Sequence, residues 1–262
     1  MRETISAVLV VKNEEHQIER VLKTLDWVDE IVVVDDQSTD RTREIAGRYT
    51  PKILPFHLSN SLAEGSEGRG MGEKAATSDW ILQMDADEEV TEKFKQECLK
   101  VLATISQDYD GFKFYRKNFF LEHPMKWGGW SSLIFRMHRR GKVTYHEKLH
   151  LGMQVQGKIG HIDAEINHYP FCSVAQFVER HNRYSTVVAE EDMKNKYGLV
   201  SLKKVKYNLT IRPIKIFWKI YIKKKGYRDG MVGLIFSVLF SFQHFLEWAK
   251  YWEKYKDQLP PK

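Results

Sequence analysis

Four acidic side chains follow an apolar run in the first third of the chain. The run Trp80–Met84 is typical of a buried strand, and Asp85, Asp87, Glu88 and Glu89 come directly after it. Residues two positions apart on an extended chain point the same way, so Asp85 and Asp87 can face one site. Mg²⁺ and Mn²⁺ prefer such oxygen ligands, and diphosphate oxygens can complete their shell. The stretch therefore predicts a divalent-metal site, and a solvated acidic turn before a helix is the alternative.

Two earlier apolar runs also end in polar side chains. Ile5–Val11 leads to Asn13, and Glu30–Val34 leads to Asp35 and Asp36. In parallel sheets, ligands bind outside the carboxyl ends of the strands, so all three strand ends are expected to face one cleft. Asp35 and Asp36 could accept hydrogen bonds from a base and from a ribose hydroxyl. Helix capping is the alternative for one of the two.

The elements that position these residues alternate between strand and helix. Asn13 could cap a first helix, and Ser38 or Thr39 could cap a second that runs to about Tyr49. Lys52–Phe56 predicts a third, weaker strand. The order indicates an α/β fold with a Rossmann-like, mostly parallel sheet and flanking helices. No glycine fingerprint of the dinucleotide or Walker type follows the first strand, which argues against NAD and P-loop chemistry.

A glycine-rich, charged segment, Glu64–Lys74, precedes the acidic strand. We expect it to be a flexible basic loop that could lay Arg69 on a nucleotide. A solvated loop without a ligand role is the alternative.

Three motifs occur in a specific order and spacing: VVKNEE at 10–15, VVVDDQSTDRT at 32–42 and ATSDWILQMDADE at 76–88. Together they resemble family-2 glycosyltransferases with the GT-A fold. The resemblance implies that Asp35 and Asp36 face the nucleoside and that Asp85 sits near the ribose. It also implies that Asp87 holds a metal on the diphosphate of a sugar nucleotide. Asn13, in the first motif, is also predicted to bind the nucleotide.

The resemblance has one departure. The family often has an Arg-Asn or Lys-Asn pair ahead of the acidic strand, and Arg69-Gly70 takes that place here. Arg69 can keep the nucleotide role.

A second stretch that could do chemistry is Val143–His150, with the pair His146-Glu147. An inverting transferase needs a general base that deprotonates the acceptor hydroxyl, and Glu147 is the candidate, with His146 beside it. The pair resembles the equivalent motif in the lipopolysaccharide-core branch of the family. Surface decoration is the alternative. A single base without a second nucleophilic carboxylate nearby favours single displacement.

Two later residues extend the predicted site. His168 could be a further metal ligand or a diphosphate contact, since GT-A enzymes often have a late histidine, and a packed or exposed histidine is the alternative. The segment Arg180–Tyr184 also resembles the lipopolysaccharide-core branch. Arg183 within it could neutralise the phosphate of the leaving group, with a solvated helix face as the alternative.

The carboxyl-terminal segment is basic and apolar. Between Leu202 and Gly230 there are ten Lys or Arg residues and one acidic residue. Arg212–Lys225 predicts a helix that rests on anionic lipid. Met231–Leu246 is apolar but shorter than the roughly 20 residues of a bilayer span, so we expect it to lie in or dip into the membrane surface. The alternative is a helical hairpin packed on the protein or across a dimer.

Composition sets wider limits. The chain has 262 residues, 42% of them hydrophobic, which suffices for a catalytic domain over residues 1–200 and a helical extension over 201–262. Two distant cysteines indicate a reducing compartment, and no signal peptide is visible. The bulky apolar face beside the basic stripe argues against nucleic-acid binding.

These observations predict an inverting, metal-dependent glycosyltransferase that uses Mg²⁺ or Mn²⁺. The expected donor is a nucleotide sugar, such as a UDP-hexose. The expected acceptor is a lipid-linked saccharide, such as the inner core of lipopolysaccharide, at the cytoplasmic side of the inner membrane. The C-terminal helices could also join two copies of the chain. The alternatives are a nucleotidyltransferase that acts on a sugar phosphate and a non-catalytic membrane-binding module.

Overall fold

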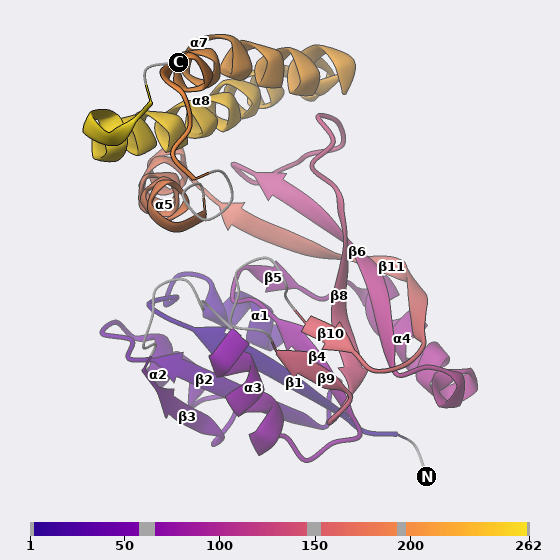
Figure 1. Ribbon diagram of the computed structural model, residues 1–262. Helices are drawn as coiled ribbons and strands as arrows, with labels where there is room; N and C mark the ends of the chain where they lie inside the picture. The colour runs from indigo at the N-terminus through magenta and orange to yellow at the C-terminus, as the bar shows by residue number, and fades with distance from the viewer. Residues whose placement is uncertain (1–2, 58–65, 146–152, 193–197, 261–262) are drawn as a thin grey trace. The chain divides into compact units, whose positions relative to one another are not determined.

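The computed structural model describes residues 3–57, 66–145, 153–192 and 198–260 (Figure 1). The chain divides into two compact units. Unit 1 comprises residues 1–117 and 132–168, and unit 2 comprises residues 118–131 and 169–262. The predicted functional division at residue 200 stays a prediction, because these units are defined by packing and not by activity.

Unit 1 is built on a sheet whose first half is parallel, as predicted. Its strands are β1 (Ile5–Val11), β2 (Glu30–Asp36), β3 (Ile53–Phe56) and β4 (Trp80–Met84), side by side in the order β3-β2-β1-β4. Every neighbouring pair in this set is parallel. The carboxyl ends of β1, β2 and β4 therefore lie at one edge of the sheet, which confirms the predicted α/β class.

The second half of the sheet continues from β4 in the order β8-β6-β11-β5. Strand β8 is antiparallel to both β4 and β6, and β5 is antiparallel to β11. A separate hairpin pairs β9 with β10, and β7 pairs with the end of β6. The bounds are Ser132–Arg139 for β8, Gly111–Phe120 for β6, Ile159–Phe171 for β11, Glu88–Glu89 for β5, Val143–Tyr145 for β9, Met153–Val155 for β10 and His123–Pro124 for β7.

Helices pack against this sheet and exclude water from it. Thr91 caps the helix that follows β5, because its side chain accepts a hydrogen bond from the Phe94 backbone N–H at 3.1 Å. The apolar side chains of the sheet and of α1 and α4 form one core. The helices are α1 (Ile18–Lys23), α2 (Thr42–Ala46), α3 (Ser66–Ala75) and α4 (Glu92–Thr104), followed by the 3₁₀ turn η1 (Ser106–Asp108).

The predicted caps of the first two helices are wrong. Helix α1 follows Gln17, while Asn13 has a positive φ of 54° and lies outside the helix. Helix α2 begins at Thr42, where the Asp40 carboxylate accepts from the Thr42 N–H at 3.0 Å. Hydrogen bonds between the loops after β1 and β2 outweigh the capping preference of these residue types.

The predicted flexible loop over residues 64–74 is also wrong, because Ser66–Ala75 forms helix α3. Glycine disfavours helices through its backbone entropy, by about 1 kcal/mol per residue. Here the missing side chains allow close packing on β1. A Cβ atom at Gly72 would lie 2.4 Å from Val8 Cγ1, and one at Gly68 would lie 3.0 Å from Val10 Cγ1. The glycines therefore set the distance between helix and sheet.

Unit 2 is mainly helical, and α7 packs along α8 (Figure 1). One of its cores gathers the rings of Phe120, Phe171, Phe177 and Phe236, and another is formed around Trp248 and Tyr251 of α8. The helices are α5 (Val174–Val187), α7 (Leu202–Phe217) and α8 (Gly230–Tyr255). Shorter helical segments are η2 (Val188–Asp192), η3 (Trp218–Lys223), η4 (Gly226–Asp229) and η5 (Lys256–Gln258).

The segment Trp127-Gly-Gly-Trp130 lies within unit 2. The Trp130 ring stacks on Phe236, with ring centroids 4.6 Å apart, so this tryptophan serves the core. The Trp127 ring lies under the Arg228 guanidinium at 4.6 Å, and its backbone N–H donates to Asp229 at 3.0 Å.

Unit 2 also leaves apolar side chains exposed. On α7 and η3 these recur at helical spacing, and on α8 they lie opposite the buried face. By length and composition alone, the helical segment Gly226–Gln258 could cross a membrane. The exposed residues are Ile211, Ile214, Trp218 and Ile222 on α7 and η3, and Met231, Val238, Phe242, Phe245 and Trp252 on α8.

Candidate active site

The carboxyl end of β2 presents two buried carboxylates. Asp36 forms an ion pair with Lys12 at 2.9 Å, and Asp35 lies 3.6 Å from Arg43. Asp35 also accepts from the Ser38 N–H at 3.3 Å, which is a turn hydrogen bond rather than a helix cap. Both residues lie where a nucleoside was predicted to bind, and that role stays a prediction.

Asn13 joins the loops that follow β1 and β2. Its side-chain oxygen accepts from the Thr39 N–H at 2.8 Å, and its own N–H donates to Ser38 Oγ at 3.0 Å. The left-handed φ is one that asparagine tolerates better than most residues. Asn13 therefore ties the two loops together beside Asp35 and Asp36, while a direct contact with the nucleotide stays a prediction.

Asp85, directly after β4, is held by arginines. Arg136 of β8 binds both carboxylate oxygens, at 2.7 and 3.2 Å, and Arg69 of α3 binds one of them at 2.7 Å. Burial acts to raise the pKa of Asp85, but the charges of Arg136, Arg69 and Arg116 hold it well below its usual range. Asp85 is therefore an ionised anchor for guanidinium groups, and Arg69 reaches the predicted site from a helix instead of a loop.

Glu88, at the start of β5, is fully buried beside Asp85. One of its oxygens accepts from the Asp85 N–H at 2.8 Å, and the other lies 3.3 Å from Arg116 of β6. Burial, followed by the nearby charge of Asp85, raises the pKa of Glu88 to about 7. These contacts fix the turn that carries Asp87.

Asp87 and His168 lie close together, and the metal role predicted for them stays a prediction. His168 Nε2 lies 3.5 Å from Asp87 Oδ1, and both side chains are largely buried. The pairing of β5 with β11, in which Glu88 faces His168, brings them together. Within the described ranges there is no group of three or more His, Cys, Asp or Glu side chains that could hold a metal. Two ligands fit Mg²⁺ or Mn²⁺, which is often held by one or two protein groups together with substrate phosphates.

The predicted base pair, His146 and Glu147, lies outside the described residues. The strand that leads to it, β9, is tied to the acidic strand. Gln83 of β4 donates to the Tyr145 hydroxyl at 2.9 Å, and the Tyr145 ring lies against Gly70 of α3. The general-base role of Glu147 stays a prediction.

Arg183 is exposed on α5 and belongs to unit 2. Its contact with a leaving-group phosphate stays a prediction.

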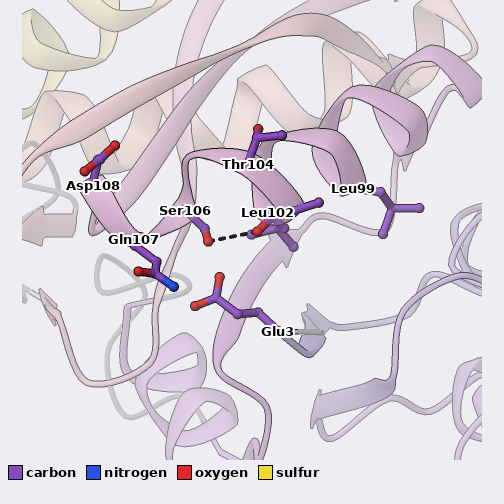
Figure 2. Close-up of a pocket in the computed structure, with 8 residues that line it drawn as sticks. Glu3, Leu99, Leu102, Thr104, Ser106, Gln107 and Asp108 are labelled. Carbon is purple, nitrogen blue, oxygen red and sulfur yellow. Dashed lines mark hydrogen bonds between the residues drawn. The ribbon is translucent and has the colours of Figure 1, made fainter. Parts of the chain in front are cut away.

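A pocket at the opposite edge of the sheet carries no such chemistry. It lies where β1 and β4 begin, because Glu3 precedes β1 and accepts from the Trp80 indole N–H at 2.9 Å. Figure 2 shows Glu3 facing the turn after α4, beside Ser106 and Gln107. We therefore assign the site to the carboxyl edge.

Three participants were missed in the sequence: Glu88 as a buried group, Arg116 and Arg136. One signal was available, since Arg136 interrupts the otherwise apolar run Leu133–Met137 of a strand. A charged residue at such a place indicates a buried partner, but its identity depends on strand pairing that the sequence does not reveal.

Known proteins similar to this chain are glycosyltransferases. The family model described as glycosyl transferase family 2 matches residues 6–153. The lipopolysaccharide core biosynthesis glycosyltransferase LpsC of Rhizobium meliloti is 25% identical over 96% of this chain and 93% of LpsC. A protein of Rickettsia felis, described as an uncharacterized glycosyltransferase, is 27% identical over 95% of this chain and 89% of that protein.

Solved structures give weaker likenesses. TarS of S. aureus matches with a TM-score of 0.45 and 16% identity, over 87% of this chain and 46% of the TarS chain. Glucosyl-3-phosphoglycerate synthase of Mycobacterium tuberculosis, solved with Mn²⁺, UDP and glucosyl-3-phosphoglycerate, matches with a TM-score of 0.35 and 25% identity. That match covers 45% of this chain and 44% of the synthase chain.

Proposed function

Because the chain belongs to glycosyl transferase family 2, we propose that it is an inverting, metal-dependent hexosyltransferase that uses a nucleotide sugar, such as a UDP-hexose. The observation that carries the proposal is the meeting of Asp35, Asp36, Asp85 and Asp87 at one edge of a parallel sheet. A non-catalytic module would not need this arrangement, and family membership disfavours a nucleotidyltransferase.

In the proposed reaction, Asn13, Asp35 and Asp36 bind the nucleoside, and Arg69 and Asp85 lie beside the ribose and diphosphate. Asp87 and His168 would hold Mg²⁺ or Mn²⁺, which would offset the negative charge of the departing diphosphate. Their proximity, 3.5 Å between side-chain atoms, supports this assignment.

The proposed base, Glu147, takes the proton of the acceptor hydroxyl as the hydroxyl oxygen attacks the anomeric carbon. The bond from that carbon to the diphosphate breaks on the opposite face, so the configuration inverts. His146 orients the base, and Arg183 offsets charge on the leaving group.

A nucleotide panel tests the proposal. Full-length protein is mixed with UDP-, GDP-, CMP- and ADP-sugars, with and without Mn²⁺, and the melting temperature and donor hydrolysis are measured. One nucleotide class should raise the melting temperature only when the metal is present, because binding to the native state stabilises it. A protein that responds to none of the nucleotides would contradict the proposal.

We further propose that the acceptor is a lipid-linked saccharide, such as the inner core of lipopolysaccharide. The matching lengths of this chain and LpsC support this acceptor class. The enzyme would act at the cytoplasmic side of the inner membrane as a peripheral protein, with catalysis in residues 1–200 and membrane contact in 201–262. The two widely spaced cysteines agree with a reducing compartment.

An exposed surface of unit 2 supports the membrane contact. On α7 and η3, the exposed apolar residues Ile214 and Trp218 alternate with the exposed lysines Lys215 and Lys219. Apolar side chains that insert between headgroups, next to cations that pair with anionic lipids, are typical of an interfacial helix. We name these residues the lysine–tryptophan face and assign it to an anionic lipid surface.

Charge removal tests this surface. Changing both Lys215 and Lys219 to Gln should weaken binding to vesicles containing anionic lipid by roughly thirtyfold, since each lysine near such a surface contributes about 1 kcal/mol. Co-sedimentation at two salt concentrations measures the change. The matched control replaces the exposed lysines Lys93 and Lys100 of unit 1 and should sediment like the wild type.

Equal sedimentation of both double variants would refute the membrane assignment. If the lysine–tryptophan face instead joins two copies of the chain, light scattering without lipid would give a doubled mass that Trp218→Ser abolishes.

A further inference from the structure

Three arginines from three elements meet two carboxylates at the carboxyl end of β4. Arg69 comes from α3, Arg136 from β8 and Arg116 from β6, and the carboxylates are Asp85 and Glu88. Between 14% and 22% of each arginine side chain is exposed. Asp87 is not counted here, because the proposed divalent ion would more than offset its charge. The cluster therefore carries more positive than negative charge.

Arg116 is less tightly bound to the carboxylates than the other two arginines. Arg136 and Arg69 already occupy both oxygens of Asp85 at short distances. Arg116 reaches Glu88 at 3.3 Å and Asp85 at 3.9 Å, both through the same terminal nitrogen. Its Nε atom is buried and has no hydrogen-bond partner among the described residues. Leaving such a donor unsatisfied is costly, so the contacts within the cluster do not satisfy this side chain. The exposed fifth of the Arg116 side chain is where an anionic ligand can pair with the guanidinium.

The sheet order separates Arg116 and Arg136 from the nucleoside strand. Asp35 and Asp36 end β2, and the strands run β2-β1-β4-β8-β6. A nucleotide that extends from β2 to the metal ligand after β4 would leave β8 and β6 on its far side. The group nearest to Arg116 and Arg136 would then belong to the acceptor.

We propose that Arg116, supported by Arg136, binds an anionic group of the acceptor saccharide, either a phosphate or a carboxylate. The inference rests on the proposed function, because that function defines which side of β4 receives the donor. Asp85 and Glu88 hold the two guanidinium groups in place, and Arg116 donates through the nitrogens that they leave unused.

Binding of inorganic sulfate to the full-length protein tests this inference. Sulfate is a tetrahedral anion that stays soluble with Mn²⁺, and it is titrated at constant ionic strength into protein saturated with Mn²⁺ and the nucleotide selected by the panel. Saturation fills the donor site, so sulfate reports a second site. The same titration without nucleotide or metal is run in parallel.

The variants are Arg116→Gln, Arg116→Lys and the matched control Lys117→Gln, which removes a charge from the next residue of β6. Arg116→Gln should weaken sulfate binding about tenfold or more, since a charge-assisted hydrogen bond contributes about 1.5–3 kcal/mol. Arg116→Lys should bind sulfate with intermediate affinity, because lysine keeps the positive charge but lacks the planar set of guanidinium donors. The control should match the wild type, and nucleotide affinity should change less than sulfate affinity in every variant.

The outcomes separate the two proposals. Sulfate binding that is absent from the wild type, or equal in Arg116→Gln and Lys117→Gln, overturns the acceptor site. A larger loss of nucleotide than of sulfate affinity in Arg116→Gln assigns the arginine to the donor and also overturns it. If no nucleotide binds, the proposed function fails, while the titration without nucleotide still reports whether Arg116 binds an anion.

Discussion

Replacing Asp87 with alanine is expected to lower the rate of sugar transfer by about a thousandfold or more while the protein stays folded. A metal that stabilises the departing diphosphate contributes several kcal/mol to the barrier, and each 1.36 kcal/mol is a factor of about ten. Steady-state transfer and the melting temperature with and without Mn²⁺ measure the effect. The variant should lose the metal-dependent stabilisation by nucleotide.

A suitable control is Glu89→Gln, which removes a neighbouring charge on β5. Glu89 lies 3.6 Å from Arg20, so the change alters a partly exposed ion pair and leaves the Asp87–His168 pair in place. This control should keep most of the transfer rate. Near-normal transfer by Asp87→Ala would instead mean that the divalent ion is held elsewhere or is not needed.

The second large effect is expected from Glu147→Gln. The amide keeps the shape of the side chain but cannot accept the proton of the acceptor hydroxyl, so kcat should fall by about 10²–10⁴. The affinity for the metal–nucleotide complex should stay close to that of the wild type, because the base contacts the acceptor. Transfer kinetics together with nucleotide titration separate these two quantities.

Glu165→Gln serves as the control for this variant, since Glu165 is an exposed carboxylate on β11. The configuration of the product, read by NMR, provides an independent check, because single displacement inverts the anomeric carbon. Normal turnover by Glu147→Gln would contradict the assignment of Glu147 as the base. A product with retained configuration would contradict the single-displacement mechanism.

The parallel half of the sheet could be predicted because its signal is local. Apolar runs such as Ile5–Val11 and Trp80–Met84 are typical of strands that helices cover on both faces. Once those strands are parallel, the polar residues that follow them meet at one edge. The proximity of Asp87 to His168 is produced by the pairing of β5 with β11, which the sequence alone does not reveal.

Other features depend on partners that are distant in sequence. The predicted caps of the first two helices are wrong because Asn13 and Thr39 hydrogen-bond to each other instead of capping helices. The arginines around Asp85 are residues 69, 116 and 136, which are distant in sequence, and only the folded chain shows that they share one carboxylate. Local patterns report burial and periodicity, whereas ion-pair partners follow from the completed sheet.

The flexible loop predicted from the glycines of α3 is wrong for a related reason, because the glycines allow the helix to pack closely on β1. A saturation mutagenesis map of this protein would mark Gly68 and Gly72 as intolerant positions, much like the acidic residues of the site. Neither glycine has a side chain that could meet a substrate, and each is intolerant because Val8 and Val10 of β1 fill the space where a Cβ would lie. Sensitivity to mutation at the two glycines would reflect the distance between α3 and β1. Sensitivity at Arg69, which lies between them, would reflect its role in the site.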